Sequence, residues 1–424
     1  MKTRIRVAFA FSIALAACSS STQSNNTGVP SLQDASSEVA DSGSSDSAAA
    51  SDAPSDATND ASSDVGDSGA VDGEANTALA ILPAPTTTLP PLHVVGNTFQ
   101  DPSGNTIILR GVAIPDIASV ALWSGGVNPR IDEVLQTMPA HVVRLPVYPR
   151  TVPNGGYPYY SPEPYPIGPA APKQSYTIAD VSAQDYVTSV LQPAVDYATS
   201  KNLYVIVDYH QIDNTLASDG GPSGSGQDAI AFWTQIAPVF SNYPNVIYEA
   251  FNEPIDTSAT TSAGGWNAAY TRFAQSLVTV IRAGAPDNLI VVGSPSWSQY
   301  PNASSGLDGG NIAMTGHTYP GNYPGKGNAF KTRVTAAAAS IPVFLTEWGF
   351  EIGDASASAT LDTPDLSWGT DLQQTVEDGG ESWVAWVADP SWGPPMFTAD
   401  GGVTEFGIFT QSWLTEDVDA DWVQ

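Results

Sequence analysis

Residues 245–254 read Asn245-Val-Ile-Tyr-Glu-Ala-Phe-Asn-Glu-Pro254, an apolar run that ends in Asn-Glu-Pro. Residues 341–349 repeat this pattern as Ile341-Pro-Val-Phe-Leu-Thr-Glu-Trp-Gly349. Each run is typical of a buried β-strand, and each has a glutamate, Glu253 or Glu347, at its carboxyl end. An unpaired buried carboxylate is costly, so the two together indicate one shared polar site rather than two surface caps. Two carboxylates beside one bond is the arrangement that glycosidic cleavage needs.

Eight apolar, β-rich runs recur after Pro91, with helical stretches between them. The runs cover residues 107–114, 141–147, 204–210, 246–252, 289–295, 313–319, 342–349 and 382–387. The clearest helical patterns cover residues 183–199, 228–240, 266–283 and 331–340. Apolar strands that alternate with helices indicate parallel strands that are buried on both faces.

The sequence therefore predicts an α/β fold, a (β/α)8 TIM barrel over residues 91–424. An N-terminal β-hairpin of residues 94–99 and 106–109 is expected to close the bottom of this barrel. A doubly wound open sheet is the alternative, but no Gly-x-Gly-x-x-Gly turn follows the first strand.

The amino-terminal residues are expected to direct export. Lys2, Arg4 and Arg6 precede an apolar run over residues 7–17 that is too short to span a bilayer in the mature protein. The end of this run, Leu15-Ala-Ala-Cys18, resembles the lipobox of bacterial lipoproteins, and Cys18 is the only cysteine of the chain. We expect residues 1–17 to be a signal peptide and Cys18 to carry the lipid, with an ordinary secretion signal as the alternative.

Residues 18–90 have the composition of a disordered acidic linker. They contain no Lys, Arg, Trp, Tyr or Phe, and therefore too little apolar surface to offset the entropy of ordering.

The formal net charge of the whole chain is −30, which argues against nucleic acid and anionic membranes as partners. We expect a monomer in the bacterial cell envelope, anchored by lipid and facing outward, or else secreted, with a neutral polysaccharide as its partner.

Polar and aromatic residues gather at the carboxyl ends of the predicted strands, where a TIM barrel has its active site. They are Arg144, His210, Asn252, Glu253, Trp297, His317, Tyr319, Glu347 and Trp386. Taken singly, Arg144 could belong to a buried ion pair and either histidine to the core, so the collective pattern carries the argument. On an extended strand Glu249 would lie about 13 Å deeper than Glu253, so we interpret it as an interior polar residue, too far away for catalysis.

Five motifs in this order together resemble glycoside hydrolase family 5, the cellulase A family of retaining barrel glycosidases. They are Val-Val-Arg144-Leu-Pro, Asp-Tyr-His210, Asn252-Glu-Pro, His317-Thr-Tyr319 and Thr-Glu347-Trp-Gly. The resemblance implies that Glu253 is the acid/base and Glu347 the nucleophile, while Asn252 binds the sugar 2-hydroxyl. It also implies that His210 and His317 line the cleavage subsite and that Trp297 and Trp386 stack on sugar rings. Arg144 and Tyr319 would keep Glu347 ionised.

We therefore expect a retaining endo-β-1,4-glycanase, in the first place an endoglucanase, with no cofactor and no metal. After Trp386 the chain continues Val-Ala-Asp-Pro-Ser-Trp392, where the best-known cellulases of the family have Asn-Leu-Ser-Asp-Lys. This departure leaves a β-1,4-mannanase or a xyloglucanase open. Two alternatives from other classes are a carbohydrate-binding lipoprotein on an inactive barrel and a structural surface lipoprotein. The intact pair of glutamates argues against the first, and the polar strand ends argue against the second.

Overall fold

The computed structural model describes residues 78–123, 126–148, 183–260, 265–301, 306–321, 328–353 and 361–416. The expected signal peptide, Cys18 and most of the expected linker lie outside these ranges, so they stay predictions. The Tyr- and Pro-rich loop after Tyr148 also lies outside them. Within the described ranges, no helix has both the length and the apolar content that crossing a membrane requires.

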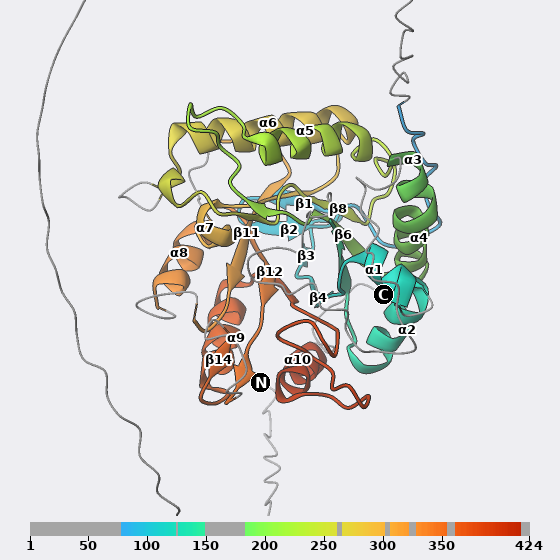
Figure 1. Ribbon diagram of the computed structural model, residues 1–424, viewed down its shortest axis with the longest axis vertical. Coiled ribbons are helices and arrows are strands. Elements are labelled where there is room, and N and C mark those ends of the chain that lie inside the picture. The colour runs from blue at the N-terminus through green and yellow to red at the C-terminus, as the bar shows by residue number, and fades with distance from the viewer. Residues whose placement is uncertain are drawn as a thin grey trace, which may run out of the picture. The chain divides into compact units, whose positions relative to one another are not determined.

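Eight parallel strands of the described chain close into a barrel (Figure 1). They are β4 (Arg110–Ala113), β5 (Val142–Val147), β6 (Tyr204–Tyr209), β8 (Val246–Glu249), β10 (Ile290–Val292), β11 (Ile312–Thr318), β12 (Val343–Trp348) and β15 (Ser382–Ala385). They follow one another around the ring in chain order, and the ring closes where β15 pairs with β4. Each strand overlaps one of the eight predicted runs, so the predicted (β/α)8 barrel is confirmed.

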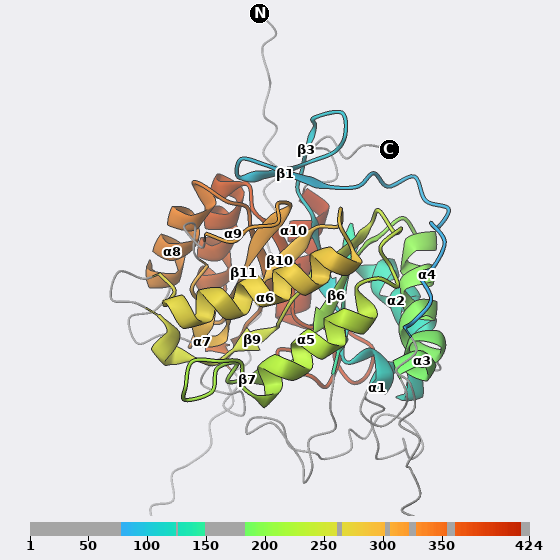
Figure 2. The same ribbon diagram turned by 90° about the horizontal axis from the view of Figure 1, so that it is seen from above.

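Helices cover the outside of this barrel (Figures 1 and 2). They are α1 (Ile117–Trp123), α2 (Val127–Thr137), α3 (Ala183–Tyr186), α4 (Gln192–Ser200), α5 (Gly224–Ile236), α6 (Ala268–Gly284), α8 (Asn328–Ala338), α9 (Ser367–Gly379) and α10 (Glu405–Glu416). All four predicted helical segments form, although a π-helical turn, Val187–Leu191, separates α3 from α4.

Helix α6 shows how the sequence specifies these elements. The side chain of its N-cap residue, Asn267, accepts a hydrogen bond from the backbone N–H of Tyr270 at 2.9 Å. Tyr270, Phe273, Leu277 and Ile281 follow at helical spacing and are all buried against the barrel and its neighbours. Burial of each such side chain contributes about 1.5–3 kcal/mol, so this face fixes the helix to the barrel.

A small antiparallel sheet closes the bottom of the barrel, at the end opposite β7 (Ile212–Asp213) and β9 (Glu253–Pro254) (Figure 2). Its strands are β1 (His93–Val95), β2 (Thr98–Gln100) and β3 (Thr106–Ile107). The ring of Phe99 is buried, with its centroid 6.0 Å from that of Phe344. The predicted closure is confirmed, but with three strands, because residues 94–99 fold back on themselves at Gly96. There φ is 62°, which glycine adopts without strain.

The chain already packs against the barrel before residue 90. Leu79 and Leu89 are buried, and the N–H of Leu82 donates to the carbonyl of Val239 at 2.9 Å. The Tyr204 hydroxyl donates to the carbonyl of Pro90 at 2.8 Å. Residues 78–90, which composition assigns to the linker, therefore contact the folded domain.

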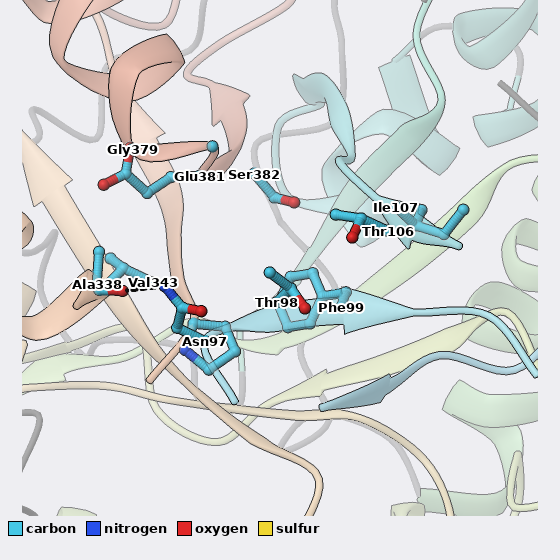
Figure 3. Close-up of a pocket in the computed structure, with 12 residues that line it drawn as sticks. Asn97, Thr98, Phe99, Thr106, Ile107, Ala338, Val343, Gly379, Glu381 and Ser382 are labelled. Atoms are coloured by element: carbon cyan, nitrogen blue, oxygen red, sulfur yellow. Dashed lines mark hydrogen bonds between the residues drawn. The ribbon is translucent and has the colours of Figure 1, made fainter. Parts of the chain in front are cut away.

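A small pocket lies between the bottom sheet and the barrel (Figure 3). Thr98 and Thr106 line it from the sheet, and Val343 and Glu381 line it from the barrel side. Glu381 is only 4% exposed, and its carboxylate accepts no hydrogen bond from the described part of the chain. Burial, with Glu377 and Asp378 nearby, raises the pKa of Glu381 to about 7.

Candidate active site

Seven of the predicted site residues meet at the carboxyl ends of the barrel strands, away from the bottom sheet. They are Arg144, His210, Asn252, Glu253, His317, Tyr319 and Glu347. All are buried except Tyr319, which is half-buried. A continuous set of hydrogen bonds and ion pairs, which also includes Asp208, connects them.

Arg144 on β5 is at the centre of this set. Its Nη1 donates to Glu347 Oε1 at 2.7 Å, its Nη2 to Asn252 Oδ1 at 2.6 Å, and its Nε to Glu249 Oε2 at 2.6 Å. Nη2 also lies 2.9 Å from Asp208 Oδ2. Because Arg144 is fully buried, its charge depends on these carboxylates for compensation.

Glu347 is held as a carboxylate. It is on β12, and besides Arg144 its Oε2 accepts the Tyr319 hydroxyl at 2.9 Å and lies 3.4 Å from His317 Nδ1. Burial raises the pKa of Glu347, but the charges of His317 and Arg144 outweigh burial and bring it below the usual range. The site therefore presents this side chain ionised.

The surroundings of Glu253 shift its pKa in the opposite direction, upward. Glu253 opens β9, and its Oε1 lies 2.9 Å from His317 Nδ1. Burial is the largest influence and raises the pKa of Glu253, and the nearby Glu347 carboxylate raises it further. Identical side chains thus have pKa values that their surroundings move apart, which is how acid and nucleophile roles are separated.

The two histidines differ in charge. Burial lowers the pKa of His317, but Glu347, Glu249 and Glu253 outweigh burial and raise it to about 10. Burial and the charge of Arg144 lower the pKa of His210 to about 3. His210 Nδ1 lies 2.6 Å from Asp208 Oδ2, within hydrogen-bond distance, and burial raises the pKa of Asp208 well above its usual range.

The predicted sugar-binding tryptophans lie on the same end of the barrel. Trp386 follows β15, is 2% exposed, and stacks on the His210 ring at 5.2 Å with an interplanar angle of 11°. Trp392, which has its ring centroid 6.0 Å from that of Trp386, joins this aromatic group. Trp297 is half-buried in the turn α7 (Pro295–Ser298) after β10, with φ of 59° in the left-handed region. Their stacking on sugar stays a prediction.

Sequence reasoning missed two polar residues beneath the carboxylates, Asp208 and Thr346, and placed a third, the interior residue Glu249, too deep. Asp208 was detectable, because it precedes His210 by two residues in the predicted run 204–210, and residues two apart on a strand face the same side. The expected depth of Glu249 is wrong because the regular strand β8 ends at Glu249 and does not extend to Glu253. His317 has one ring nitrogen 3.7 Å from Glu249 and the other 2.9 Å from Glu253.

Glu253, His317 and Glu347 each offer an atom within 4.8 Å of the others, which is close enough for a metal ion in this part of the described chain. A histidine ligand must be neutral to bind a metal, whereas the surrounding carboxylates favour the protonated His317. The donor set therefore fits proton and glycosyl transfer better than metal binding.

A (β/α)8 barrel with two close carboxylates at the carboxyl ends of its strands is the architecture of the barrel glycoside hydrolases. The family model described as cellulase (glycosyl hydrolase family 5) matches residues 101–391. The chain therefore belongs to glycoside hydrolase family 5, which confirms the resemblance seen in the motifs.

Relatives of known activity agree with this assignment. The chain is 30% identical to endoglucanase Z of Dickeya dadantii over 232 residues, which are 53% of this chain and 49% of that protein. It is 29% identical to endoglucanase MaCel5A of a Microbulbifer species over 306 residues, 65% of this chain and 50% of that protein. The chain spans about half the length of the curated relatives it matches.

Solved structures share the fold. The native β-glucanase SdGluc5_26A of Saccharophagus degradans superposes with a TM-score of 0.61 at 23% identity, covering 78% of this chain and 94% of that one. The catalytic domain of Thermobifida fusca endoglucanase Cel5A gives a TM-score of 0.57 at 21% identity, covering 76% and 97%.

Proposed function

We propose that this chain is a retaining endo-β-1,4-glucanase in which Glu347 is the nucleophile and Glu253 the acid/base. The separation of the two carboxyl groups carries the proposal, since an oxygen of each lies within 4.8 Å of the other. Retaining enzymes place these groups about 5–5.5 Å apart, whereas inverting enzymes need about 6.5–9.5 Å to admit a water molecule. The observed separation favours the retaining mechanism.

In the first step Glu347 attacks the anomeric carbon and forms a glycosyl ester, while the bond to the leaving oxygen breaks. Glu253 gives its proton to that oxygen, which its raised pKa allows. Arg144 and Tyr319 hold Glu347 ionised and direct its oxygens toward the sugar.

In the second step Glu253, now a carboxylate, accepts a proton from water, and that water attacks the anomeric carbon and releases Glu347. Asn252 supports both steps. Its Oδ1 accepts from Arg144, which turns the amide so that Nδ2 is the free end, and Nδ2 is buried without a hydrogen bond from the described residues. A sugar 2-hydroxyl fits this donor, and such a contact strengthens in the transition state.

The relatives support a β-1,4-glucan as substrate, because those named above are endoglucanases. The Saccharophagus β-glucanase, whose barrel this chain shares, was also solved in complex with cellotetraose. The segment after Trp386 departs from the family pattern, so a β-1,4-mannanase or xyloglucanase is the alternative specificity. A non-catalytic binder would have no use for two glutamates with opposite pKa shifts.

Two variants and a label test the proposal. We expect Glu347→Gln to abolish hydrolysis of cellulose derivatives, mannan, xyloglucan and xylan alike, because no other group can form the ester. Glu253→Gln should spare the first step for substrates with acidic leaving groups, which need no proton, and slow the second. A 2-fluoro glycoside should label Glu347, and early-time NMR should show a β-configured product.

The control is Glu405→Gln, which removes an exposed carboxylate from the start of α10 and should retain full activity. An inverted product, or a label on any other residue, would overturn the mechanism. Hydrolysis of mannan or xyloglucan in preference to cellulose derivatives would replace the substrate while leaving the mechanism intact.

A further inference from the structure

Glu249 is a fully buried carboxylate that the proposed reaction does not use. It is the last residue of β8, four positions before Glu253. Its two oxygens face different partners. Oε2 accepts from Arg144 Nε at 2.6 Å, and Oε1 accepts from the Thr346 hydroxyl at 2.6 Å.

The contact with Arg144 sets the direction of the whole guanidinium. This group is planar, so fixing Nε also fixes where Nη1 and Nη2 point. Nη1 then donates to Glu347 at 2.7 Å and Nη2 to Asn252 at 2.6 Å. Glu249 thereby orients the Arg144 guanidinium toward both Glu347, the proposed nucleophile, and Asn252, the residue proposed to bind the sugar 2-hydroxyl.

The Thr346 hydroxyl connects Glu249 to His317 through two hydrogen bonds. Thr346 gives its hydroxyl hydrogen to Glu249, so its oxygen is left to accept from His317 Nε2 at 3.0 Å. The same Glu249 oxygen lies 3.7 Å from Nε2 and stabilises the imidazolium directly. Nδ1–H of the imidazolium then donates to Glu253 Oε1 at 2.9 Å, which leaves Oε2 of Glu253 to hold the acid proton.

Charge points to the same role. Arg144 and His317 both face Glu347, at 2.7 and 3.4 Å, and Glu249 gives these two buried cations a further anion that takes no part in the proposed reaction. Asp208 faces Arg144 from β6, and Glu253 faces His317 from β9. Burial raises the pKa of Glu249, but Arg144 and His317 outweigh burial and lower it to about 2.

We propose that Glu249 is a positioning residue that holds the guanidinium of Arg144 and the imidazolium of His317 in the orientations in which they serve Glu347 and Glu253. It touches neither substrate nor reacting atoms, and acts through these two cations. The inference rests on the proposed function, since the roles of Glu253 and Glu347 come from it.

Histidine NMR provides a test that needs no substrate. The chain has four histidines, so a sample labelled with 15N-histidine gives few signals to assign. We expect Glu249→Gln to lower the pKa of His317 by about 1–3 pH units, the usual effect of losing an opposite charge at this range. In the unmodified protein His317 should stay an imidazolium through neutral pH.

The matched control is Glu377→Gln on α9. It makes the same change in charge and also breaks an arginine–carboxylate ion pair, here with Arg110 at 2.6 Å. The pKa of His317 and the rate of hydrolysis should both be unchanged in this variant. A merely structural loss of an ion pair would affect the two variants alike.

Kinetics complete the test. Glu249→Gln should lower kcat on cellulose derivatives about 100-fold, the cost of a misplacement of roughly 1 Å, and change its pH profile. If Glu249→Gln does not fold, Thr346→Val keeps the shape and charge but removes the bridging hydroxyl. Thr346→Val should lower the pKa of His317. Thr346→Ser, which keeps the hydroxyl, should have the same His317 pKa as the unmodified protein.

An unchanged pKa of His317 in Glu249→Gln would overturn the inference. If Glu249→Gln does not fold, an unchanged pKa of His317 in Thr346→Val would overturn it instead. An unmodified protein that hydrolyses no β-glycan would refute the proposed function, while the titration would still decide the role of Glu249.

Discussion

Tyr319 is the least buried of the residues that hold the ionised Glu347, and its contribution is a single hydrogen bond of 2.9 Å. A hydroxyl that donates to a carboxylate favours the ionised form and so lowers its pKa. Activity should require Glu347 ionised and Glu253 protonated. It should therefore fall as pH drops through the lowered pKa of Glu347, and fall again as pH rises through the raised pKa of Glu253.

From this we predict that Tyr319→Phe moves the acidic limb of the kcat/KM profile upward by roughly one pH unit. The alkaline limb should move much less, because Tyr319 donates to Glu347 and not to Glu253. Tyr243→Phe is the control, since it removes an equivalent bond, from the Tyr243 hydroxyl to Asp196 at 2.6 Å, outside the site. Equal profiles for both variants would show that Tyr319 does not tune Glu347.

At the scale of elements, the junction between α9 and β15 contains an unusual carboxylate. Glu381 follows Gly380, the left-handed cap of α9, and its own N–H donates to the carbonyl of Val376 at 3.2 Å. A negative charge at a helix carboxyl end opposes the helix dipole. Burial is the main cause of the rise in the pKa of Glu381 from 4.5 to about 7, and the nearby Glu377 and Asp378 carboxylates add to it.

The raised pKa makes stability depend on pH. The folded protein binds the Glu381 proton more tightly than the unfolded chain does. The resulting stability is fully present below the unfolded pKa and is lost as pH rises to about 7. We predict that Glu381→Gln is more stable than the unmodified protein at about pH 8, by up to about 3 kcal/mol, and has no such advantage at about pH 4.

Urea unfolding at the two pH values measures this difference. Glu416→Gln, an exposed carboxylate on α10, should show no such dependence. A Glu381→Gln advantage that is the same at both pH values would mean that shape, rather than charge, causes it.

The elements themselves were largely predictable because barrel strands are buried on both faces and therefore appear as apolar runs. The strand ends also placed both glutamates correctly at one end of the barrel, whereas Arg144 lies in the middle of β5 and reaches Glu347 through its long side chain. Departures from regular geometry were not predictable in this way. The turn at Gly96 and the end of β8 at Glu249 depend on where a strand stops, and the residue types in a run do not fix that point.

At the scale of the whole molecule, composition alone misplaced the start of the packed chain. The stretch 78–90 has no aromatic or basic residue, yet Leu79 and Leu89 are buried on the barrel. A few buried leucines are enough to hold such a stretch against the surface of the barrel. The average composition of a segment does not reveal the burial of single residues.

We predict that a protein beginning at residue 78 keeps the thermal stability of the full chain, whereas one beginning at residue 91 loses roughly 3 kcal/mol. The loss corresponds to exposing Leu79 and Leu89, at about 1.5 kcal/mol or more each. Calorimetry of both truncations would measure it. Equal melting temperatures would show that residues 78–90 rest on the barrel without stabilising it.

The pairing of β15 with β4 also determines when this barrel can form during synthesis. The N–H of Leu109 donates to the Ser382 hydroxyl, a partner 273 residues later in the chain. At roughly 5–20 residues per second, a ribosome needs roughly 14–55 s to make that partner. Throughout this time the first strand has an unpaired edge, and such edges template association with other chains. The nascent protein therefore exposes this edge to other chains until its last strand emerges.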